Sequence, residues 1–416
     1  MVALCFAVGL AGYGWYSQPQ YQALRKELGH QPEKALVFAH VRCFDAEKAE
    51  VNAGQTVIVS GDHIEAMGRD DQVKIREGSE VIDGTGKTLL PGLFDMHAHL
   101  QPAAGLASIA SGVTTVRDLG NQTSRLLALK KAWDSDLEIG PRVLMAAPLN
   151  SSRGKGERVT TEEEARAAIG RYKDAGYLQI KILGELKPAL VPDVVKTAHA
   201  AGMRVSGHVP EGMKAEEFVR AGVDELQHMA YLLKSLTPSG AKTSPQEPEE
   251  GARLDIDSPS VTTWIKMLKD RNVVVDPTMN VYEAKYGGRG GVSEAYYQNM
   301  LRMLKRLYDE GVPLALGADG PQTPGASLHR EIQIWVSAGV PAPKVLQIVT
   351  IGAARIMKVD RETGSIQPGK KADLVLVDGD PTQDIGSARK CQIVVKDGIL
   401  YRSADLYRAA SLKPPQ

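Results

Sequence analysis

Short apolar runs separated by Gly and Asp occupy both ends of the chain, and a different pattern lies between them. The runs cover residues 34–44, 55–60, 63–67 and 80–83 near the N-terminus and 372–378, 391–396 and 398–401 near the C-terminus. Runs of this length, rich in Val and Ile and bounded by turn residues, are typical of β-strands. Because both ends share this pattern, we predict one small β-sandwich domain built from residues 35–90 and 362–403.

Between these ends, strand-like runs alternate with amphipathic helical stretches. Eight apolar runs end near His99, Asp118, Pro148, Lys181, His208, His228, Thr278 and Asp319. One helix is expected to start at Thr160 or Thr161, where a capping hydroxyl precedes a run of Glu residues. The glycines expected to end a helix before the next strand are Gly176, Gly202, Gly222 and Gly311. This alternation predicts an α/β fold, a (β/α)8 TIM barrel over residues 91–361.

The first 34 residues fall outside both predicted domains. Residues 2–16 are uncharged and apolar, as long as the core of a signal peptide but shorter than the roughly 20 residues that span a bilayer. No basic segment precedes them. For residues 1–34 we favour an export signal or truncated membrane anchor over an ordinary N-terminal segment. We therefore favour a periplasmic, secreted or membrane-tethered protein over a cytoplasmic one.

One other segment carries neither a helical nor a strand period. Residues 237–256 contain three prolines and follow the strand that ends at His228. A loop of this length in a compact barrel is usually functional or disordered, so a lid over the active site and a solvated excursion both stay open. Residues 404–416 form a C-terminal tail.

The charge and cysteine content argue against several classes of function. The chain has 50 Lys plus Arg and 50 Asp plus Glu, so it shows no electrostatic footprint for nucleic acid or for a polyanionic substrate. Its three cysteines, Cys5, Cys43 and Cys391, are far apart and form no Cys-x-x-Cys pair, which argues against a cysteine zinc site or disulfide framework. We expect Cys43 and Cys391, each in a strand-like run, to be buried free thiols.

The strand ends of the predicted barrel are rich in groups that bind metals. His97 and His99 lie two apart on the first strand, where the period of two puts both imidazoles on one face. His208, His228 and Asp319 each close a short apolar strand. Polar residues at the carboxyl ends of barrel strands lie in the active site, so these groups are expected to meet there.

A lysine within an apolar strand adds to this set. Lys181 lies in the run 177–183, where an ammonium group is costly unless it is paired or modified. Taken singly, Lys181 could extend to solvent, and His208 or His228 could be a satisfied core histidine. Because five strands of one barrel each carry such a group, the pattern favours a metal site over chance.

These residues lie in motifs that resemble the amidohydrolase superfamily in its binuclear form with a carboxylated lysine. The motifs are Leu90-Pro-Gly-Leu-Phe-Asp-Met-His-Ala-His99, Ala221-Gly-Val-Asp-Glu-Leu-Gln-His228, Gly317-Ala-Asp319 and Gly364-Ser-Ile-Gln-Pro-Gly-Lys-Lys-Ala-Asp-Leu-Val-Leu-Val-Asp378. The resemblance covers residues 35–403. Within the superfamily, the chain is most similar to the imidazolonepropionase-like and prolidase-like branch, with its Xaa-Pro and Xaa-Arg dipeptidases and N-acyl amino acid hydrolases.

The resemblance implies a role for each group. The histidine pair of the first strand would bind the more buried of two divalent metals, and His208 with His228 the more exposed one. Lys181, carboxylated on its amine, would bridge both. Asp319 would ligate the buried metal and carry the proton of a metal-bridging hydroxide to the leaving amine. These ligand types suit Zn²⁺ best, with Mn²⁺ or Co²⁺ as alternatives.

Further residues near the strand ends are expected to contact the substrate or support the ligands. Arg117, at the end of the second strand, could bind a substrate carboxylate or pair with Asp118. Tyr231, three residues after His228, could reach the substrate or pack within its loop. The other candidates are Thr278, Asn280 and Tyr282 as pocket lining, and His329 as a support behind the ligands or a helix cap.

We therefore expect a metal-dependent hydrolase that cleaves an amide bond in a small molecule, such as a dipeptide or an N-acyl amino acid. A cyclic amide, a lactone or an aromatic C–N bond is an alternative for the same metal centre, since only the pocket shape separates these substrates. An inert binding module that kept the fold is a further alternative, although all six ligand positions are filled. The sequence leaves the oligomeric state open, a homo-oligomer included.

Overall fold

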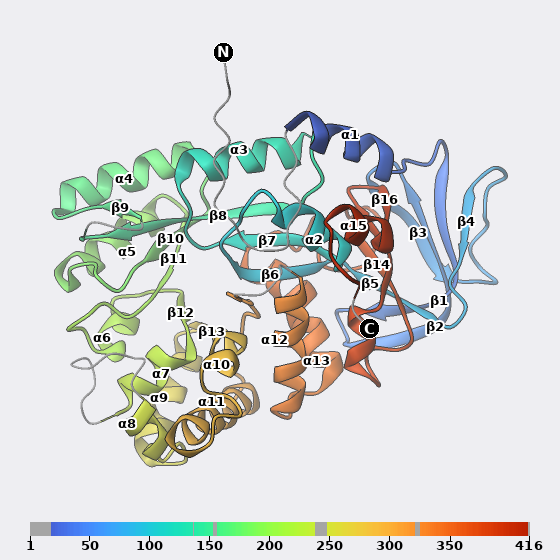
Figure 1. Cartoon of the computed structure of the whole chain (residues 1–416). Helices are drawn as coiled ribbons and strands as arrows, with labels where there is room; N and C mark the ends of the chain where they lie inside the picture. The colour runs from blue at the N-terminus through green and yellow to red at the C-terminus, as the bar shows by residue number, and fades with distance from the viewer. Residues whose placement is uncertain (1–17, 136, 153–155, 238–247, 321–324, 415–416) are drawn as a thin grey trace.

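A computed structural model describes residues 18–135, 137–152, 156–237, 248–320 and 325–414. A barrel with its surrounding helices lies on one side of the molecule and a β-rich domain on the other (Figure 1). The chain begins in the described part with α1 (Gln18–Leu28). The apolar segment 2–16, interpreted as an export signal or anchor, lies outside the described residues, as do residues 238–247 of the segment considered as a lid or a solvated excursion.

Parallel strands form the wall of the barrel in the order β6–β7–β8–β10–β11–β12–β13. They are β6 (Leu93–Ala98), β7 (Val113–Asp118), β8 (Arg142–Asn150), β10 (Gln179–Ile182), β11 (Arg204–Gly207), β12 (Glu225–Gln227) and β13 (Val274–Asp276), with β9 (Glu157–Arg158) paired to β8. An irregular eighth segment closes the ring, because Leu314 bridges Val275 and the Asp319 N–H donates to the His97 carbonyl. The predicted barrel is therefore confirmed.

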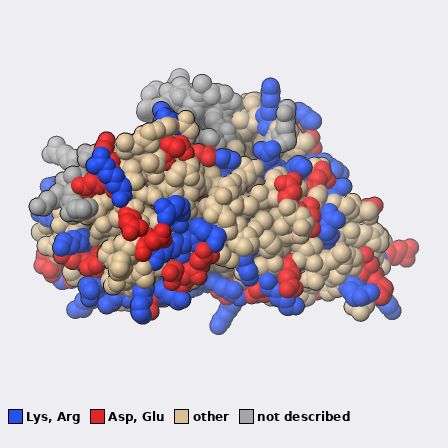
Figure 2. All heavy atoms as spheres, turned by 90° about the horizontal axis from the view of Figure 1, so that it is seen from below, with Lys and Arg blue, Asp and Glu red and all other residues tan. Residues whose placement is uncertain are grey.

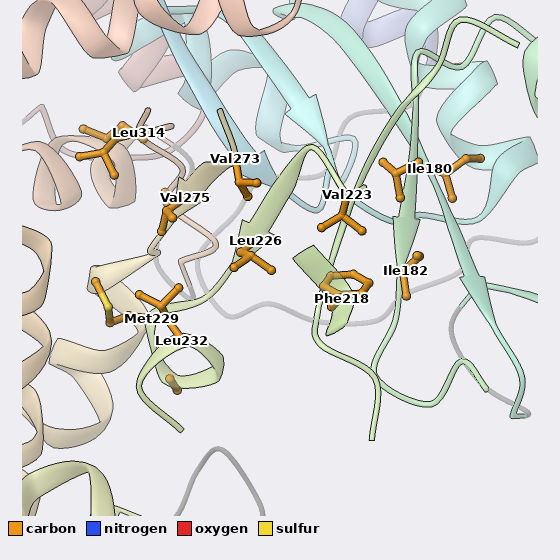
Figure 3. Close-up of a cluster of buried hydrophobic side chains, with 14 of the residues drawn as sticks. Ile180, Ile182, Phe218, Val223, Leu226, Met229, Leu232, Val273, Val275 and Leu314 are labelled. Atoms are coloured by element: carbon orange, nitrogen blue, oxygen red, sulfur yellow. The ribbon is translucent and has the colours of Figure 1, made fainter. Parts of the chain in front are cut away.

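Side chains alternate along the barrel strands between the outer core and the interior. Ile180 and Ile182 of β10 belong to the large buried cluster outside the wall, together with Phe218 and Leu226 (Figure 3). Lys181 stands between the two isoleucines and so faces the opposite side of the strand. This packing directs the lysine amine into the barrel interior.

Helices cover the outside of the barrel (Figure 1). They are α2 (Ala104–Ala110), α3 (Thr123–Asp134), α4 (Glu162–Asp174), α5 (Val191–Ala200), α6 (Ala215–Arg220), α7 (Met229–Ser235), α8 (Pro248–Arg253), α9 (Pro259–Asp270), α10 (Met279–Tyr286), α11 (Gly291–Asp309), α12 (Ala326–Ser337), α13 (Ala342–Gln347) and α14 (Ala353–Ile356), with the short turns η1 (Pro188–Leu190) and η3 (Ile348–Gly352). The predicted start of one helix is confirmed, since the Thr161 hydroxyl accepts from the Glu164 N–H and caps α4. The four predicted glycine turns are confirmed by φ angles of 84°, 70°, 98° and 75° at Gly176, Gly202, Gly222 and Gly311.

The second domain is a continuous sheet with the order β16–β15–β14–β5–β1–β2–β3, in which β4 also pairs with β1. Its elements are β1 (Ala35–Asp45), β2 (Glu50–Ser60), β3 (His63–Arg69), β4 (Glu80–Asp83), β5 (Lys87–Pro91), β14 (Leu374–Asp378), β15 (Cys391–Lys396) and β16 (Ile399–Arg402), with η4 (Ile385–Arg389) between β14 and β15. Leu36 and Val57 share a buried cluster with Leu374 and Val395 from the other half of the sheet. The small domain built from both ends of the chain is therefore confirmed, whereas its residue boundaries stay predictions.

Polar contacts fasten the barrel to the small domain. Arg142 at the start of β8 donates to Asp373 and Asp397, each at 2.5 Å. Beyond β16, α15 (Ser403–Ala409) packs on α2, where the Tyr407 hydroxyl lies 2.8 Å from Ser111 Oγ. These contacts join β8 and the end of α2 to the C-terminal part of the chain.

Three further features are the cysteines, the hydropathy of the helices and the charge of the surface. Cys43 and Cys391 are buried free thiols, as predicted, and burial raises the pKa of each to about 12. Among the described residues, no helix is both long and apolar enough to cross a bilayer. Figure 2 shows acidic and basic side chains interspersed over the visible face, which agrees with the balanced charge of the chain.

Candidate metal centre

The six predicted ligands follow barrel strands and point toward a common place at the carboxyl ends of those strands. They are His97, His99, Lys181, His208, His228 and Asp319. Ligand atoms of His97, His228 and Asp319 all lie within 4.8 Å of one another, close enough to hold one ion. The structure thus brings together residues that are more than 200 positions apart in the chain.

His97, near the end of β6, is fully buried and held by a carboxylate. Its Nδ1–H donates to Asp276 Oδ2 at 2.7 Å. This leaves Nε2 with its lone pair directed at the site, 3.2 Å from Lys181 Nζ and 3.8 Å from Asp319 Oδ2. Burial and the nearby Lys181 amine lower the pKa of His97, so its ring is neutral, as a metal ligand must be.

His99 is oriented in the same way by a backbone group. Its Nδ1–H donates to the Gly120 carbonyl at 2.9 Å, and its Nε2 lies 3.4 Å from Asp319 Oδ1. The side chain keeps 37% exposure. His99 therefore stands at the solvent side of the site while His97 forms its floor.

His208 and His228 form a second pair that faces the first. Their Nε2 atoms are only 3.0 Å apart, and His228 Nδ1 lies 2.9 Å from Thr278 Oγ1. Burial and the Lys181 amine lower the pKa of His228 to about 3, so the His228 ring is neutral where the two nitrogens meet. This arrangement presents two lone pairs to one point, as a divalent cation requires.

Lys181 and Asp319 lie between the histidine pairs. Lys181 is 2% exposed, and burial lowers its pKa to about 8, although the Asp319 and Asp276 carboxylates oppose the shift. Burial raises the pKa of Asp319, but its contact with His99 and the nearby His228 give a net lowering, so it is ionised. Four imidazoles around an anionic carboxylate fit a divalent metal such as Zn²⁺.

The backbone is strained where three neighbouring strand ends reach the site. His228, Thr278 and Asp319 have φ angles of 71°, 49° and 39°, in the left-handed region that such residues rarely adopt. Each costs on the order of 1–3 kcal/mol. We attribute this strain to the need to turn the side chains inward at the points where β12, β13 and the eighth segment end.

Arg117, which we expected to bind a substrate carboxylate or pair with Asp118, is placed elsewhere. Its guanidinium is completely buried and makes two 2.6 Å bonds to Glu225, and its Nε–H donates to the Met96 carbonyl at 2.7 Å. The arginine thus lies beneath the ligands and is engaged by a carboxylate of its own. The partner differs from the expected Asp118, because inward-pointing residues of β7 and β12 meet inside the barrel.

Two carboxylates in this buried layer were missed by the sequence interpretation. Asp276 ends the apolar run of β13, and Glu225 begins β12. Burial and the neighbouring Glu225 raise the pKa of Asp276, and Arg117 opposes that shift. The signal for Asp276 was present, since an acidic residue closes its strand just as Asp319 closes the eighth segment.

Of the other expected residues, two adjoin the predicted ligands, and Tyr282 and His329 make other contacts. Tyr231 of α7 stacks on His208 at 4.9 Å between ring centroids, and Thr278 contacts His228, so both adjoin the ligands. Tyr282 is buried and parallel to Tyr286 in α10. His329 donates from Nε2 to the Ser111 carbonyl at 2.8 Å, which caps the end of α2.

Asn280 and a small cavity lie beside Asp319. The Asn280 Nδ2 atom is buried without a hydrogen-bond partner, as is Ser327 Oγ, and both lie next to Gly320. A cavity of about 90 Å³ is lined there by His99, Asp319, Gly320 and Ser327, among others. Asp319 therefore adjoins a space large enough for a few waters or a small chemical group.

Residues 88–400 match the amidohydrolase family. Imidazolonepropionase from Alkaliphilus oremlandii is 24% identical over 375 residues, which cover 77% of this chain and 83% of that protein. The 5-methylthioadenosine/S-adenosylhomocysteine deaminase from Caldanaerobacter subterraneus is 24% identical over 408 residues, covering 82% and 84%. A crystal structure of a Xaa-Pro dipeptidase with bound methionine shares the fold, with a TM-score of 0.71, 20% identity and coverage of 89% of this chain and 100% of that one.

Proposed function

The chain belongs to the amidohydrolase family, and we propose that it hydrolyses the amide bond of a small peptide-like molecule, either a dipeptide or an N-acyl amino acid. The observation that carries this proposal is the convergence of imidazoles and one carboxylate at the carboxyl ends of the barrel strands. The fold shared with a Xaa-Pro dipeptidase supports a peptide-like substrate.

We propose two divalent metal ions, Zn²⁺ or alternatively Mn²⁺ or Co²⁺, held by the two histidine pairs. Lys181, carboxylated on its amine, would bridge them, since a free ammonium cannot bind a cation and a carbamate offers two anionic oxygens. A pKa of about 8 gives Lys181 a neutral amine fraction able to react with CO2 near neutral pH. Bound metals would supply a hydroxide nucleophile near neutral pH and polarise the scissile carbonyl.

Side chains of the protein would then transfer the proton and contact the substrate. Asp319 is ionised and borders the small cavity, so its carboxylate can accept the nucleophile's proton and return it to the leaving amine. Tyr231, stacked on His208, offers its hydroxyl to a substrate beside the second histidine pair. His97 and His99 keep their Nε2 lone pairs directed inward because their Nδ1–H groups are engaged.

A second candidate substrate is a cyclic amide or another C–N bond in a ring. The similarity to imidazolonepropionase and to a deaminase favours a substrate of this kind. The same residues of the site would hydrolyse it. A catalytically inert binding module is less consistent with the site, because all six predicted ligand positions are filled by side chains that can bind metal.

The test combines metal analysis with a substrate panel. We expect the purified protein to bind two Zn²⁺ per chain and to hydrolyse members of a panel of dipeptides and N-acyl amino acids. Chelation should abolish turnover, and Zn²⁺, Mn²⁺ or Co²⁺ should restore it. Asp319→Asn should lower kcat by about 10²–10⁴-fold. The matched control is His199→Gln, at an exposed histidine that pairs with Asp224.

Two results would count against the proposal. Turnover that survives complete metal removal would exclude a metal-dependent mechanism. Turnover of cyclic amides, with none of linear ones, would replace the proposed substrate by the alternative one.

A further inference from the structure

We propose that Asp276 is a positioning residue of the metal centre, and that the buried Arg117–Glu225 pair holds its carboxylate in place. Asp276 would fix the orientation and tautomer of His97, and so set the metal affinity of the inner histidine pair. The inference rests on the metal centre of the proposed function, although it concerns only residues that the structure describes.

The contact between Asp276 and His97 is specific. Asp276 ends β13, which only the eighth segment separates from β6 in the closed barrel, and the side chains of Asp276 and His97 have no solvent exposure. The 2.7 Å bond joins Asp276 Oδ2 to His97 Nδ1, and Lys181 Nζ lies 3.2 Å from Nε2, so we assign the ring proton to Nδ1 and the lone pair to Nε2. A carboxylate on the far nitrogen of a metal-binding histidine both orients the ring and increases its basicity.

Arg117 links this carboxylate to the backbone that carries His97. Its Nη2 lies 3.7 Å from Asp276 Oδ2, and its Nε–H donates to the carbonyl of Met96, the residue before His97. Glu225 fixes the guanidinium with two 2.6 Å bonds. The planar guanidinium therefore connects β6, β12 and β13 by directed contacts that a point charge could not reproduce.

Two glutamines add hydrogen bonds to the Arg117–Glu225 pair. Gln179 Oε1 accepts from Arg117 Nη1 at 3.3 Å, and Gln227 Nε2 donates to Glu225 Oε1 at 3.2 Å. Both glutamines also contact Ser206 Oγ. Gln227 Oε1 and Asp276 Oδ1 are buried in this layer without a hydrogen-bond partner. Removing one side of the Arg117–Glu225 pair would leave the other charge buried without its partner.

Without Asp276, nothing in this contact would select the Nδ1–H tautomer of His97. A ring protonated on Nε2 cannot donate a lone pair to a metal at that atom. Asp276→Asn keeps the shape but can present an N–H to His97 Nδ1, and Asp276→Ala removes the partner altogether. We therefore expect both variants to weaken metal binding, the second more strongly.

The experiment measures metal affinity, independently of turnover. Metal-free wild type, Asp276→Asn and Asp276→Ala are titrated with Zn²⁺ against a chromophoric chelator. We expect the affinity of one of the two ions to fall by about 10–100-fold in Asp276→Asn. Histidine-selective ¹⁵N NMR of the metal-free protein should show His97 protonated on Nδ1 in the wild type and redistributed toward Nε2 in the variant.

Glu331→Gln provides a matched control in the same region. Glu331 is a buried carboxylate that accepts from the N–H groups of Met279 and Asn280, just after β13, and burial raises its pKa to about 8. It touches the backbone of this loop rather than a ligand ring. We expect its variant to bind Zn²⁺ with an affinity within about threefold of the wild type.

Three outcomes would overturn the inference. They are unchanged Zn²⁺ affinity in a folded Asp276→Asn, an equal loss in Glu331→Gln, and an Nε2-protonated His97 in the metal-free wild type. The NMR measurement of His97 in the metal-free wild type tests the inference even if the Asp276 variants fail to fold. A wild type that binds no metal would instead refute the proposed function.

Discussion

At the residue scale, Lys181 links the fold most directly to the chemistry. The isoleucines on either side of it are buried outside the wall, so the amine has no route to solvent along the strand. Its closest described partner is an imidazole nitrogen rather than a carboxylate. A lysine that is buried without a close anion is suited to modification, which explains why this residue can stand in an apolar strand.

This environment predicts a dependence of metal loading on CO2. Because only the neutral amine reacts with CO2 and the pKa of Lys181 is about 8, loading should be faster at pH 8.5 than at pH 6.5. We expect Zn²⁺ to restore activity to the metal-free enzyme faster with added bicarbonate than in CO2-free buffer. Lys181→Met should bind fewer than two ions under either condition. Equal rates with and without bicarbonate would contradict a carbamate bridge.

At the element scale, the eighth segment is held against β6 by the close approach of two backbones. A Cβ at Gly317 would lie 2.4 Å from His97 Cβ and 2.5 Å from His97 N, so no side chain fits there. Asp319, two residues later, donates its N–H to the His97 carbonyl. The spacing between Gly317 and Asp319 therefore fixes where the carboxylate stands relative to the histidines.

We predict that Gly317→Ala destabilises the fold by about 3 kcal/mol or more, because the clash is with backbone that cannot move aside. Metal affinity should fall with it, since Asp319 and His97 move apart. The control is Gly202→Ala, where φ is +70° and no atom lies within 4 Å of the new Cβ. That variant should lose only about 1–2 kcal/mol through backbone strain and keep its metal affinity. Urea unfolding and Zn²⁺ titration of both variants provide the measurements.

At the scale of the whole molecule, Arg142 joins the barrel to the small domain. Its partners Asp373 and Asp397 flank the strands that the C-terminal segment contributes to the second sheet. Burial opposes ionisation of Asp397, but the Lys396 and Arg142 cations lower its pKa to about 2. The stabilisation that comes from ionised Asp397 is therefore present above the unfolded-state pKa of about 4. It is lost as the pH falls through the folded-state pKa of about 2.

We predict that Arg142→Met lowers the free energy of unfolding by about 2–4 kcal/mol at pH 7. The figure lies toward the low side for a buried pair because 25% of the Asp397 side chain is exposed. Between pH 4 and pH 2, the variant should lose less stability than the wild type. Arg166→Met, at a half-exposed arginine that pairs with Asp193, should cost less stability than Arg142→Met. A similar loss of unfolding free energy in Arg142→Met and Arg166→Met would contradict the role of Arg142 in joining the two domains.

Local sequence was sufficient to predict the elements and the candidate metal ligands. A strand of period two, a glycine that ends a helix and a polar residue at a strand end are each recognisable within a few positions. Parallel strands then bring all their carboxyl ends to one side. For this reason His97, His99, His208, His228 and Asp319 could be named before the structure, and Thr161 could be expected to cap its helix.

Tertiary structure alone decided the partners of those residues. Arg117 pairs with Glu225 across 108 positions, and Asp276 holds His97 across 179. No local pattern encodes which inward side chains meet, because that depends on the closure and stagger of the barrel. The sequence therefore determined that six candidate ligands would converge, and the three-dimensional packing determined that a buried arginine lies beneath them, paired with Glu225.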